Sequence, residues 1–292
     1  MNVLLVGNKG ALLDETELAL LKFGHSVIVI VLSLDVFLED SDLECFTPPL
    51  ALSIVVYVGG EVRDKARMEI ANIIVPKRLL DYASKRKARF VYLSTLAVYP
   101  LFPWPNVVGT GPRFYAPIGQ YGSTKAVFDR YAEQSEVGFS GIQPASIVGS
   151  ERLESSLDKT ILALIRYPIL RFIDVGTVIG FCERSEVVNS ILDIVSKERN
   201  SGFVVLSHDV AISRIQSAVY QRRFRPIFRA GPLIRIAATV LFKVMSIWPL
   251  RISYYTNQTR FTSNFSGVDL NKDIEELVGR RVTYIRQHLQ GM

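Results

Sequence analysis

The sequence predicts an α/β fold built on a doubly wound parallel sheet. Short, unbroken apolar runs alternate with longer amphipathic stretches, and most of the apolar runs end at glycine or hydroxyl residues. Unbroken apolar runs are typical of strands buried on both faces, and the alternation indicates βαβ units with right-handed crossovers. We expect strands at 2–6, 27–32, 53–58, 89–93 and 141–148, and helices at 13–23, 63–85 and 120–135.

The pattern loosens beyond Gly149. We expect one domain over residues 1–150 and a smaller, irregular lobe over 151–292 that packs against it and does not form an independent module. Expected helices in the lobe are 156–165, 183–196, 212–221, 233–247 and 271–278, and expected strands are 169–174 and 203–207.

Composition excludes several classes of protein. The 292 residues are 49% hydrophobic and 21% charged, which indicates a globular chain with a large core and not a disordered one. The net charge of +6 suits an anionic substrate, and the scattered basic residues disfavour nucleic acid. Cys45 and Cys182 lie far apart and the three histidines are dispersed, so we expect no metal site and reduced thiols in a cytoplasmic protein.

The apolar segment 233–250 raises the question of membrane contact. Arg235 and Lys243 interrupt it, so we expect an amphipathic helix and not a spanning one. That helix either packs on the core or lies partly in a membrane interface. The basic cluster before it is either a solvated face or an attraction to an anionic membrane, which leaves peripheral association open; its members are Arg222, Arg223, Arg225 and Arg229.

The tetrapeptide Gly-Asn-Lys-Gly at 7–10 follows the first expected strand and opens the first expected helix. Backbone N–H groups at such a turn can bind a dinucleotide pyrophosphate, so Gly7, Lys9 and Gly10 are candidate cofactor-binding residues. Leu13 stands where a third glycine is common, and we expect it to shift the helix outward or to loosen the site. The second strand ends without an acid, and Lys9 either faces a 2′-phosphate, which favours NADP over NAD, or is a solvated cation.

Tyr121 and Lys125 lie four residues apart at the start of an expected helix, so they share one face. A phenol has a pKa of about 10, and an adjacent ammonium lowers that pKa toward the range of acid–base catalysis. Ser94 and Thr95 end an expected strand at the carboxyl edge of the sheet, where open α/β folds bind ligands. A lone Tyr-x-x-x-Lys can be a surface pair, but the ordered set predicts hydride transfer between a nicotinamide and an alcohol.

These motifs resemble those of the extended short-chain dehydrogenases/reductases, specifically the NAD-dependent epimerase/dehydratase family. Residues 72–99 resemble that family's helix, strand and Ser-Ser/Thr signature, and Tyr-Gly-Ser-Thr-Lys at 121–125 matches its active-site helix. Residues 232–277 are similar to the tail of bacterial O-antigen enzymes that act at C4 of UDP-N-acetylhexosamines.

The resemblance implies a role for each candidate residue. Tyr121 would be the acid/base, and Lys125 would hold the cofactor ribose and tune the tyrosine. Thr95 would be the substrate-binding hydroxyl, with Ser94 beside it near the nicotinamide. Arg260 either contacts the UDP diphosphate through charge-assisted hydrogen bonds or is a solvated cation.

The resemblance also implies the cofactor, the substrate and the assembly. Residues 1–150 would form a Rossmann-like domain that binds NAD or NADP, and residues 151–292 would bind a nucleotide sugar. The chain would form a homodimer through its two long helices. The reaction would be C4 epimerisation or 4-keto reduction in the synthesis of a surface polysaccharide.

Several departures from the family pattern indicate a divergent member. Gln143 stands where arginine is usual, Leu13 replaces a glycine, Pro100 stands where glycine is common, and Tyr-Val-Gly-Gly occupies 57–60 where the family tends to have His-Leu-Ala-Ala. The alternative function is therefore a catalytically weak dinucleotide-binding protein that acts as a sensor or scaffold. A third is a peripheral membrane adaptor that uses the 233–250 helix.

Overall fold

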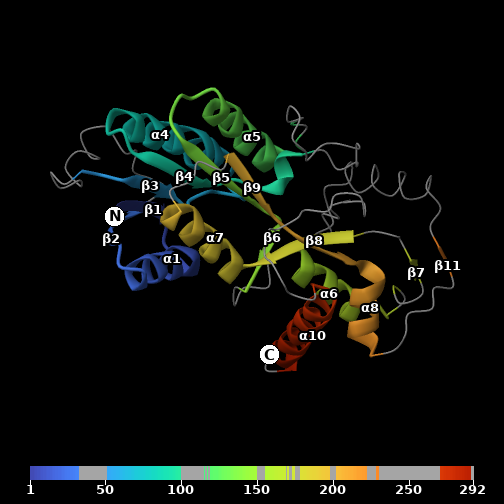
Figure 1. The fold of residues 1–292 in the computed structure, drawn as a ribbon. Helices are drawn as coiled ribbons and strands as arrows, with labels where there is room; N and C mark the ends of the chain where they lie inside the picture. Colours follow the sequence, from blue (N-terminus) through green and yellow to red (C-terminus); the bar gives the residue numbers. More distant parts are fainter. Residues whose placement is uncertain are drawn as a thin grey trace. The chain divides into compact units, whose positions relative to one another are not determined.

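The computed structural model describes residues 1–32, 51–99, 115, 117, 119–149, 155–168, 170, 173–174, 178–197, 202–221, 228–229 and 270–290. The chain divides into two compact units, whose elements are drawn in Figure 1. The first comprises Met1–Pro100, Gly109–Pro144 and Arg184–Leu206, and the second comprises Leu101–Val108, Ala145–Glu183 and Ser207–Met292.

The first unit contains a six-stranded parallel sheet in the order β2-β1-β3-β4-β5-β9. The strands neighbouring β1 lie on opposite sides of it, so the carboxyl ends of β1 and β3 form the switch point at which open α/β sheets bind ligands. The predicted Rossmann-like parallel sheet is therefore confirmed. Its strands are β1 (Asn2–Asn8), β2 (Ser26–Leu32), β3 (Ile54–Tyr57), β4 (Arg89–Leu93), β5 (Phe139–Pro144) and β9 (Gly202–Leu206).

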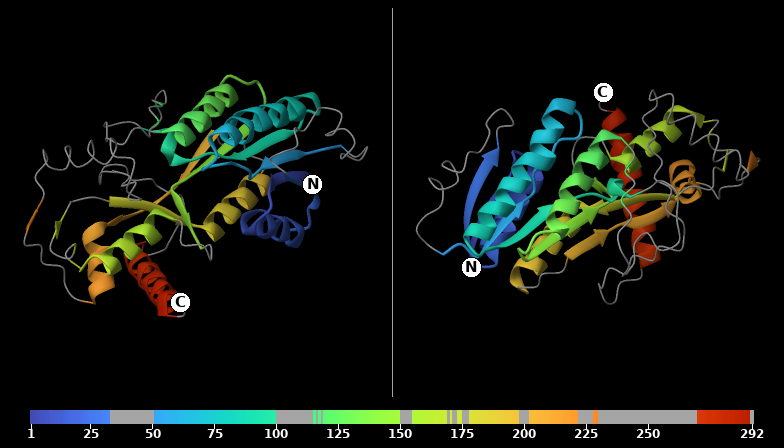
Figure 2. Two further views of the ribbon diagram at one scale, coloured as in Figure 1. Left: turned by 180° about the vertical axis from the view of Figure 1, so that it is seen from behind. Right: turned by 90° about the horizontal axis from the view of Figure 1, so that it is seen from above.

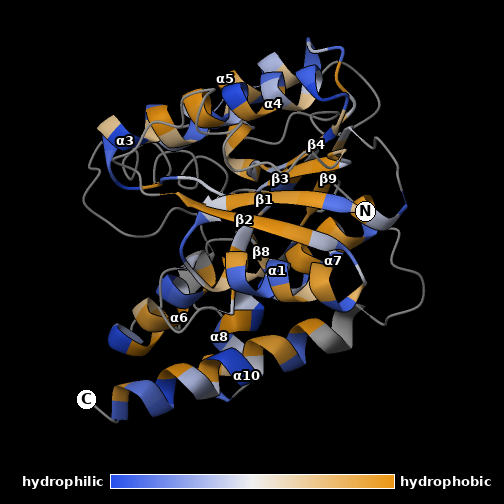
Figure 3. Ribbon diagram, turned by 90° about the vertical axis from the view of Figure 1, so that its left-hand side faces the viewer, coloured by the Kyte–Doolittle hydropathy of each residue, from blue (hydrophilic) through white to orange (hydrophobic). Residues whose placement is uncertain are grey.

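Helices cover both faces of this sheet (Figure 3). One face carries α1 (Ala11–Lys22) and α7 (Arg184–Ser196), and the other carries α4 (Val75–Lys85) and α5 (Gln120–Glu133). The first unit thus takes α7 and β9 from the second half of the chain, and the Arg89 guanidinium of β4 donates to two carbonyls near the end of α7.

The expected helix 63–85 is interrupted by a change of helical type. It begins as α3 (Lys65–Glu69), passes through a π-helical turn, η1 (Ile70–Ile74), and continues as α4. A π turn inserts one extra residue into the helix and often lies at a functional site. In this chain the inserted turn carries Asn72.

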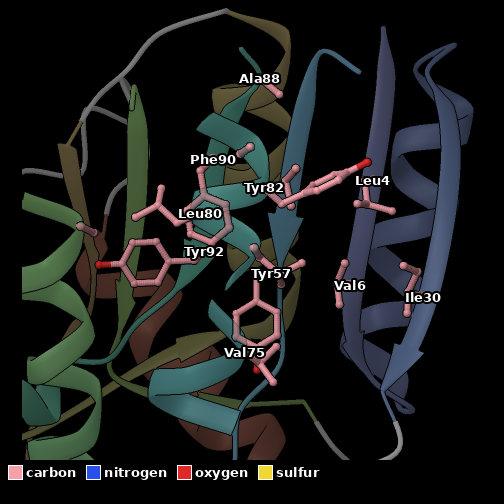
Figure 4. Packing of buried hydrophobic residues seen from close by; sticks show 14 of the residues in the cluster. Leu4, Val6, Ile30, Tyr57, Val75, Leu80, Tyr82, Ala88, Phe90 and Tyr92 are labelled. Carbon is pink, nitrogen blue, oxygen red and sulfur yellow. The ribbon is translucent and has the colours of Figure 1, made fainter. Parts of the chain in front are cut away.

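The core between the sheet and α4 and α5 is aromatic. Tyr57, Phe90, Tyr92 and Phe128 are fully buried there. The rings of Phe90 and Tyr92 lie side by side in Figure 4, with centroids 5.7 Å apart, and the Phe128 ring meets Tyr92 edge to face at 4.7 Å. Each such ring contributes a large buried apolar area, and the edge-to-face geometry adds to it.

The second unit contains a three-stranded sheet in the order β10-β8-β6 and a pair of two-residue strands. The helices described in this unit are α6 (Ser156–Arg166), α8 (Ile212–Tyr220) and α10 (Leu270–Gln290) (Figure 2). Each contributes to one buried apolar cluster, with Ile161 from α6, Ile215 from α8 and Val282 from α10. The strands are β6 (Ser146–Val148), β8 (Val178–Glu183), β10 (His208–Ala211), β7 (Ile173–Asp174) and β11 (Phe228–Arg229).

The structure corrects two expected elements. The expected strand 141–148 is two strands: β5 ends at Pro144, and β6 pairs with β8 in the other sheet. Proline has no amide proton, which weakens a continuous ladder there. The expected helix 271–278 extends to Gln290, because Val278, Val282 and Ile285 repeat at helical spacing and are buried, which overrides the breaking tendency of Gly279.

Among the helices that the structure describes, none is long and apolar enough to cross a membrane. Segment 233–250 and three of the four basic residues before it, Arg222, Arg223 and Arg225, lie outside the described residues.

A buried ion pair attaches α10 to α6. The Asp158 side chain has 0% exposed area, and Arg281 contacts it at 2.5 Å from Nε to Oδ1 and 3.0 Å from Nη2 to Oδ2. Asp158 also forms a capping box with Ser155 at the start of α6. The carboxylate therefore has its acceptors occupied, which a charge out of water requires.

We expect Arg281→Leu to lower the free energy of unfolding by about 3 kcal/mol, because it leaves the Asp158 carboxylate buried without its cation. Urea denaturation would measure the change. Arg280→Leu is the matched control: Arg280 is 66% exposed and lies 3.8 Å from Glu183, so its loss should change stability by less than about 0.5 kcal/mol. Equal effects of the two variants would contradict the prediction.

Candidate active site

The first turn of α1 is open to a ligand at the end of β1. Gly10 precedes the helix without a side-chain cap, and among the described residues, its two chain neighbours aside, no atom lies within 4 Å of the position that a Cβ would take there. The first intrahelical bond runs from Asp14 N to Gly10 O, so the three preceding N–H groups have no partner within the helix. Lys9 in the same turn is exposed. This arrangement fits the pyrophosphate of a dinucleotide.

Gly7 allows β1 to lie close to its neighbours. A Cβ at Gly7 would stand 2.7 Å from Val58 Cγ2 and 3.1 Å from Leu13 Cδ1. Leu13 is buried at 2% exposure, so its side chain occupies space that the missing side chain of Gly7 leaves free. The departure at Leu13 is in this way accommodated by the first glycine of the turn.

Asn8 joins the two strand ends at the switch point. Its Nδ2 donates to Gly60 O at 3.4 Å, and its Oδ1 accepts from Gly60 N at 3.3 Å. The side chain thus pairs with both backbone groups of one residue after β3. Asn8 was not among the predicted site residues; an amide side chain inside a glycine turn was the available signal.

Lys125 is buried at the ends of β3 and β4. The residue is 3% exposed, and its Nζ donates to Leu93 O at 2.8 Å and to Gly59 O at 3.3 Å. Burial lowers the pKa of Lys125 to about 8, and the negative charge of Asp129 partly offsets this effect. The ammonium is therefore charged at neutral pH but close to its titration range.

Thr95 and α5 meet at a short turn. Thr95 Oγ1 accepts from Ala97 N at 3.2 Å and so caps the 3₁₀ turn η2 (Leu96–Val98). A Cβ at Gly122 would stand only 2.3 Å from Ala97 O, which shows how closely the first turn of α5 approaches η2. Tyr121, the residue before Gly122, is partly exposed. This contact places the Tyr121–Lys125 helix against the turn that follows Thr95.

Asn72, in the π turn, is a site residue that sequence reasoning missed. Its side chain is fully buried, donates to Glu61 O at 2.8 Å and to Thr124 Oγ1 at 3.1 Å, and accepts from Glu61 N at 3.1 Å. It therefore connects the loop after β3 with α5. A buried asparagine within an apolar helix was the signal that could have identified it.

Asp129, one helical turn after Lys125, is the third site residue that was not predicted from the sequence. Its fully buried carboxylate accepts from Tyr92 OH at 2.8 Å, from Ser94 Oγ at 2.8 Å to each oxygen, and from Gln143 Nε2 at 2.9 Å. Burial raises the pKa of Asp129 to about 6, while these hydrogen bonds and the charge of Lys125 act in the opposite direction. Ser94, predicted to lie near a nicotinamide, donates its hydroxyl proton to this carboxylate.

Two departures from the family pattern are compensated by their neighbours. Gln143 bridges Asp129 and Tyr99, whose hydroxyl donates to Gln143 Oε1 at 2.8 Å. The Tyr57 ring lies against Gly59, where a Cβ would stand 2.5 Å from the ring, and Tyr57 OH donates to Ala71 O in the π turn. A bulky residue at 57 therefore requires the glycine at 59.

The structure brings most of the predicted residues to one edge of the sheet. Ser94, Thr95 and Lys125 lie at the end of β4 or in contact with it, with Tyr121 on the same helix as Lys125. Gly7, Lys9 and Gly10 lie at the end of β1 in the same sheet, whereas Arg260 lies outside the described residues. In the described part of the chain, no group of three or more His, Cys, Asp or Glu residues could hold a metal ion.

Part of the chain is similar to a known protein family. Residues 39–168 match the model of the NAD dependent epimerase/dehydratase family, somewhat less than half of the chain. The family resemblance is confirmed. No curated protein matches the sequence.

Solved structures show the same fold at low identity. The Bordetella bronchiseptica enzyme WbmH, in complex with NAD+, is 18% identical, with a TM-score of 0.64 over 98% of each chain. The WbmG enzyme of the same organism, in complex with NAD, is 18% identical, with a TM-score of 0.60 over 80% of this chain and 82% of its own. A dTDP-4-dehydrorhamnose reductase from Yersinia enterocolitica is 15% identical, with a TM-score of 0.63 over 97% and 99%.

We expect Gly122→Ala to destabilise the chain by roughly 1–3 kcal/mol, because the new methyl group would overlap the Ala97 carbonyl and force α5 away from η2. Thermal unfolding would measure the loss. Gly279→Ala is the matched control, since a Cβ there would meet no atom within 4 Å from other parts of the described chain, and alanine favours a helix interior by about 0.5–1 kcal/mol. A Gly122→Ala chain as stable as the unsubstituted one would show that the close approach is not required.

Proposed function

We propose that this chain is an NAD(P)-dependent enzyme that performs hydride chemistry at C4 of a nucleotide sugar, as an epimerase or a 4-keto reductase in surface polysaccharide synthesis. The observation that carries the proposal is the buried Lys125 ammonium, which donates to carbonyls at the ends of β3 and β4. Lys125 lies on the same helix as Tyr121. The family match and the fold shared with sugar-modifying enzymes support it. The similarity of residues 232–277 to O-antigen enzymes supports the UDP-sugar substrate and the pathway.

The proposed roles follow from charge and position. The Tyr121 phenol oxygen takes the proton of the sugar hydroxyl when the carbinol is oxidised and returns it when the ketone is reduced. The Lys125 ammonium favours the phenolate, because a nearby positive charge stabilises the ionised form. The Thr95 hydroxyl holds the reacting oxygen, and Arg260 binds the diphosphate.

The cofactor in this proposal is NAD or NADP. The turn at 7–10 and Lys125 would hold the dinucleotide, whose nicotinamide supplies the acceptor or donor of the hydride. We favour NADP, because Lys9 is an exposed cation in the turn and the second strand ends without an acid.

We further propose a homodimer that works in the cytoplasm, with peripheral attachment to the inner membrane through segment 233–250.

We expect Tyr121→Phe to lower turnover of UDP-sugars about a hundred- to ten-thousand-fold, because it removes the group that transfers the proton and leaves the ring in place. Turnover is measured by chromatography of the sugar products and by absorbance at 340 nm. Ser123→Ala is the matched control on the same helix: its hydroxyl is exposed and donates only to Gly119 O in the described contacts. Unchanged turnover in Tyr121→Phe would favour the sensor or scaffold alternative.

The same assay separates the two forms of the reaction. Because an epimerase returns the hydride to its substrate, it should retain the cofactor through purification, as mass spectrometry of the native protein would show. A reductase should consume NAD(P)H in a one-to-one ratio with a 4-keto sugar.

We expect Lys9→Met to weaken binding of NADPH about fivefold and to leave binding of NADH unchanged, because an exposed contact between a cation and a phosphate contributes about 1 kcal/mol. Titration calorimetry with both cofactors would measure the difference. An equal effect on both would show that Lys9 does not face the 2′-phosphate.

A further inference from the structure

Two residues of opposite charge, Asp129 and Lys125, lie one turn apart on α5 in the core of the first unit. Both residues are buried, at 0% and 3% exposure. The Asp129 carboxylate is held by three neutral side chains, Tyr92, Ser94 and Gln143, and by no cation among the hydrogen-bond partners described. Its negative charge is therefore not neutralised by the groups that hold it in place.

Gln143 holds the Asp129 carboxylate without adding a compensating positive charge. Nε2 donates to Asp129, and Oε1 accepts from the Tyr99 hydroxyl, so the amide is satisfied at both ends and stays neutral. An arginine at this position, as in the resembled family, would place a second cation beside the carboxylate. With glutamine there, the positive charge that lowers the pKa of Asp129 is that of Lys125.

We propose that Asp129 is the counter-charge of Lys125, a positioning residue that keeps the buried ammonium protonated at the edge of the sheet. This inference rests on the proposed function for its catalytic meaning, since Lys125 is there the group that favours the Tyr121 phenolate. Its physical content is independent of any reaction: removal of the negative charge at 129 makes the ammonium easier to deprotonate.

The groups facing the pair come from several elements. Tyr92 and Ser94 lie on or just after β4, Gln143 lies on β5, and the Gly59 and Leu93 carbonyls accept from Lys125. Asn72 Oδ1 and Lys125 Nζ both lie close to Gly60, and the charges of Glu133 and Tyr115 act on Tyr92. Burial and Asp129 raise the pKa of Tyr92 well above its usual range, so Tyr92 stays a neutral donor.

The pair defines a window of pH. Asp129 is ionised above about pH 6, and Lys125 is protonated below about pH 8, so both charges coexist between these values. If the two groups are coupled, each should move the titration of the other.

The test is NMR titration of the full-length chain with ¹³C-labelled lysine, with and without NAD. The Lys125 ε-carbon signal is assigned by its loss in Lys125→Arg. We expect Asp129→Asn to move the Lys125 titration to lower pH by roughly one pH unit, because a charge next to a buried ion is weakly screened. Thermal unfolding of each variant confirms that it is folded.

Tyr92→Phe is the matched control. It removes one hydrogen bond to Asp129 and keeps the carboxylate charge and the ring, so it should leave the Lys125 titration near pH 8 in place. A purely structural role of Asp129 would predict no movement of the Lys125 titration in either variant. An unchanged Lys125 titration in a folded Asp129→Asn chain would overturn the proposal.

Gln143→Arg gives a second route if Asp129→Asn does not fold. It keeps the carboxylate and adds a cation beside it, so it should also move the Lys125 titration to lower pH, and no movement would contradict the proposal.

An unsubstituted chain without turnover on nucleotide sugars would contradict the proposed function alone, because the NMR titration detects the coupling without a reaction.

Discussion

The buried ammonium of Lys125 constrains the arrangement of the elements around it. A charge removed from water needs acceptors close by, or it loses its proton. Lys125 obtains them from the carbonyls of Gly59 and Leu93, which follow β3 and end β4. Because one side chain must reach both carbonyls, the start of α5 is fixed against the carboxyl edge of the sheet. The candidate active site lies at that edge.

The close approach of α5 depends on groups that take little space or that bond across the gap. Gly122 lets the helix meet the Ala97 carbonyl, and Gly60 leaves room for Lys125 and Asn72. The π turn places Asn72 so that its amide reaches both Thr124 and the backbone of Glu61. The site is thus held mainly by backbone contacts and buried amides, which are rigid and specific in direction.

The divergence of this chain from the family pattern is local and compensated. Leu13 fills space beside Gly7, Tyr57 packs on Gly59, and Gln143 satisfies both Tyr99 and Asp129. Each replacement has a neighbour of matching size or polarity. The substitution at Gln143 also changes the electrostatics, since it leaves a buried carboxylate next to Lys125 without an added cation.

The sequence alone determined the parallel sheet, because unbroken apolar runs and glycine turns are local properties of the chain. It also identified Tyr121 and Lys125 as one face of a helix, since their spacing is fixed by helical geometry. It did not identify Asn8, Asn72 or Asp129, whose partners lie between 11 and 52 residues away along the chain. Nor did it separate β5 from β6 or extend α10 beyond Gly279. Those outcomes depend on which side chains are buried together, and only the tertiary structure decides that.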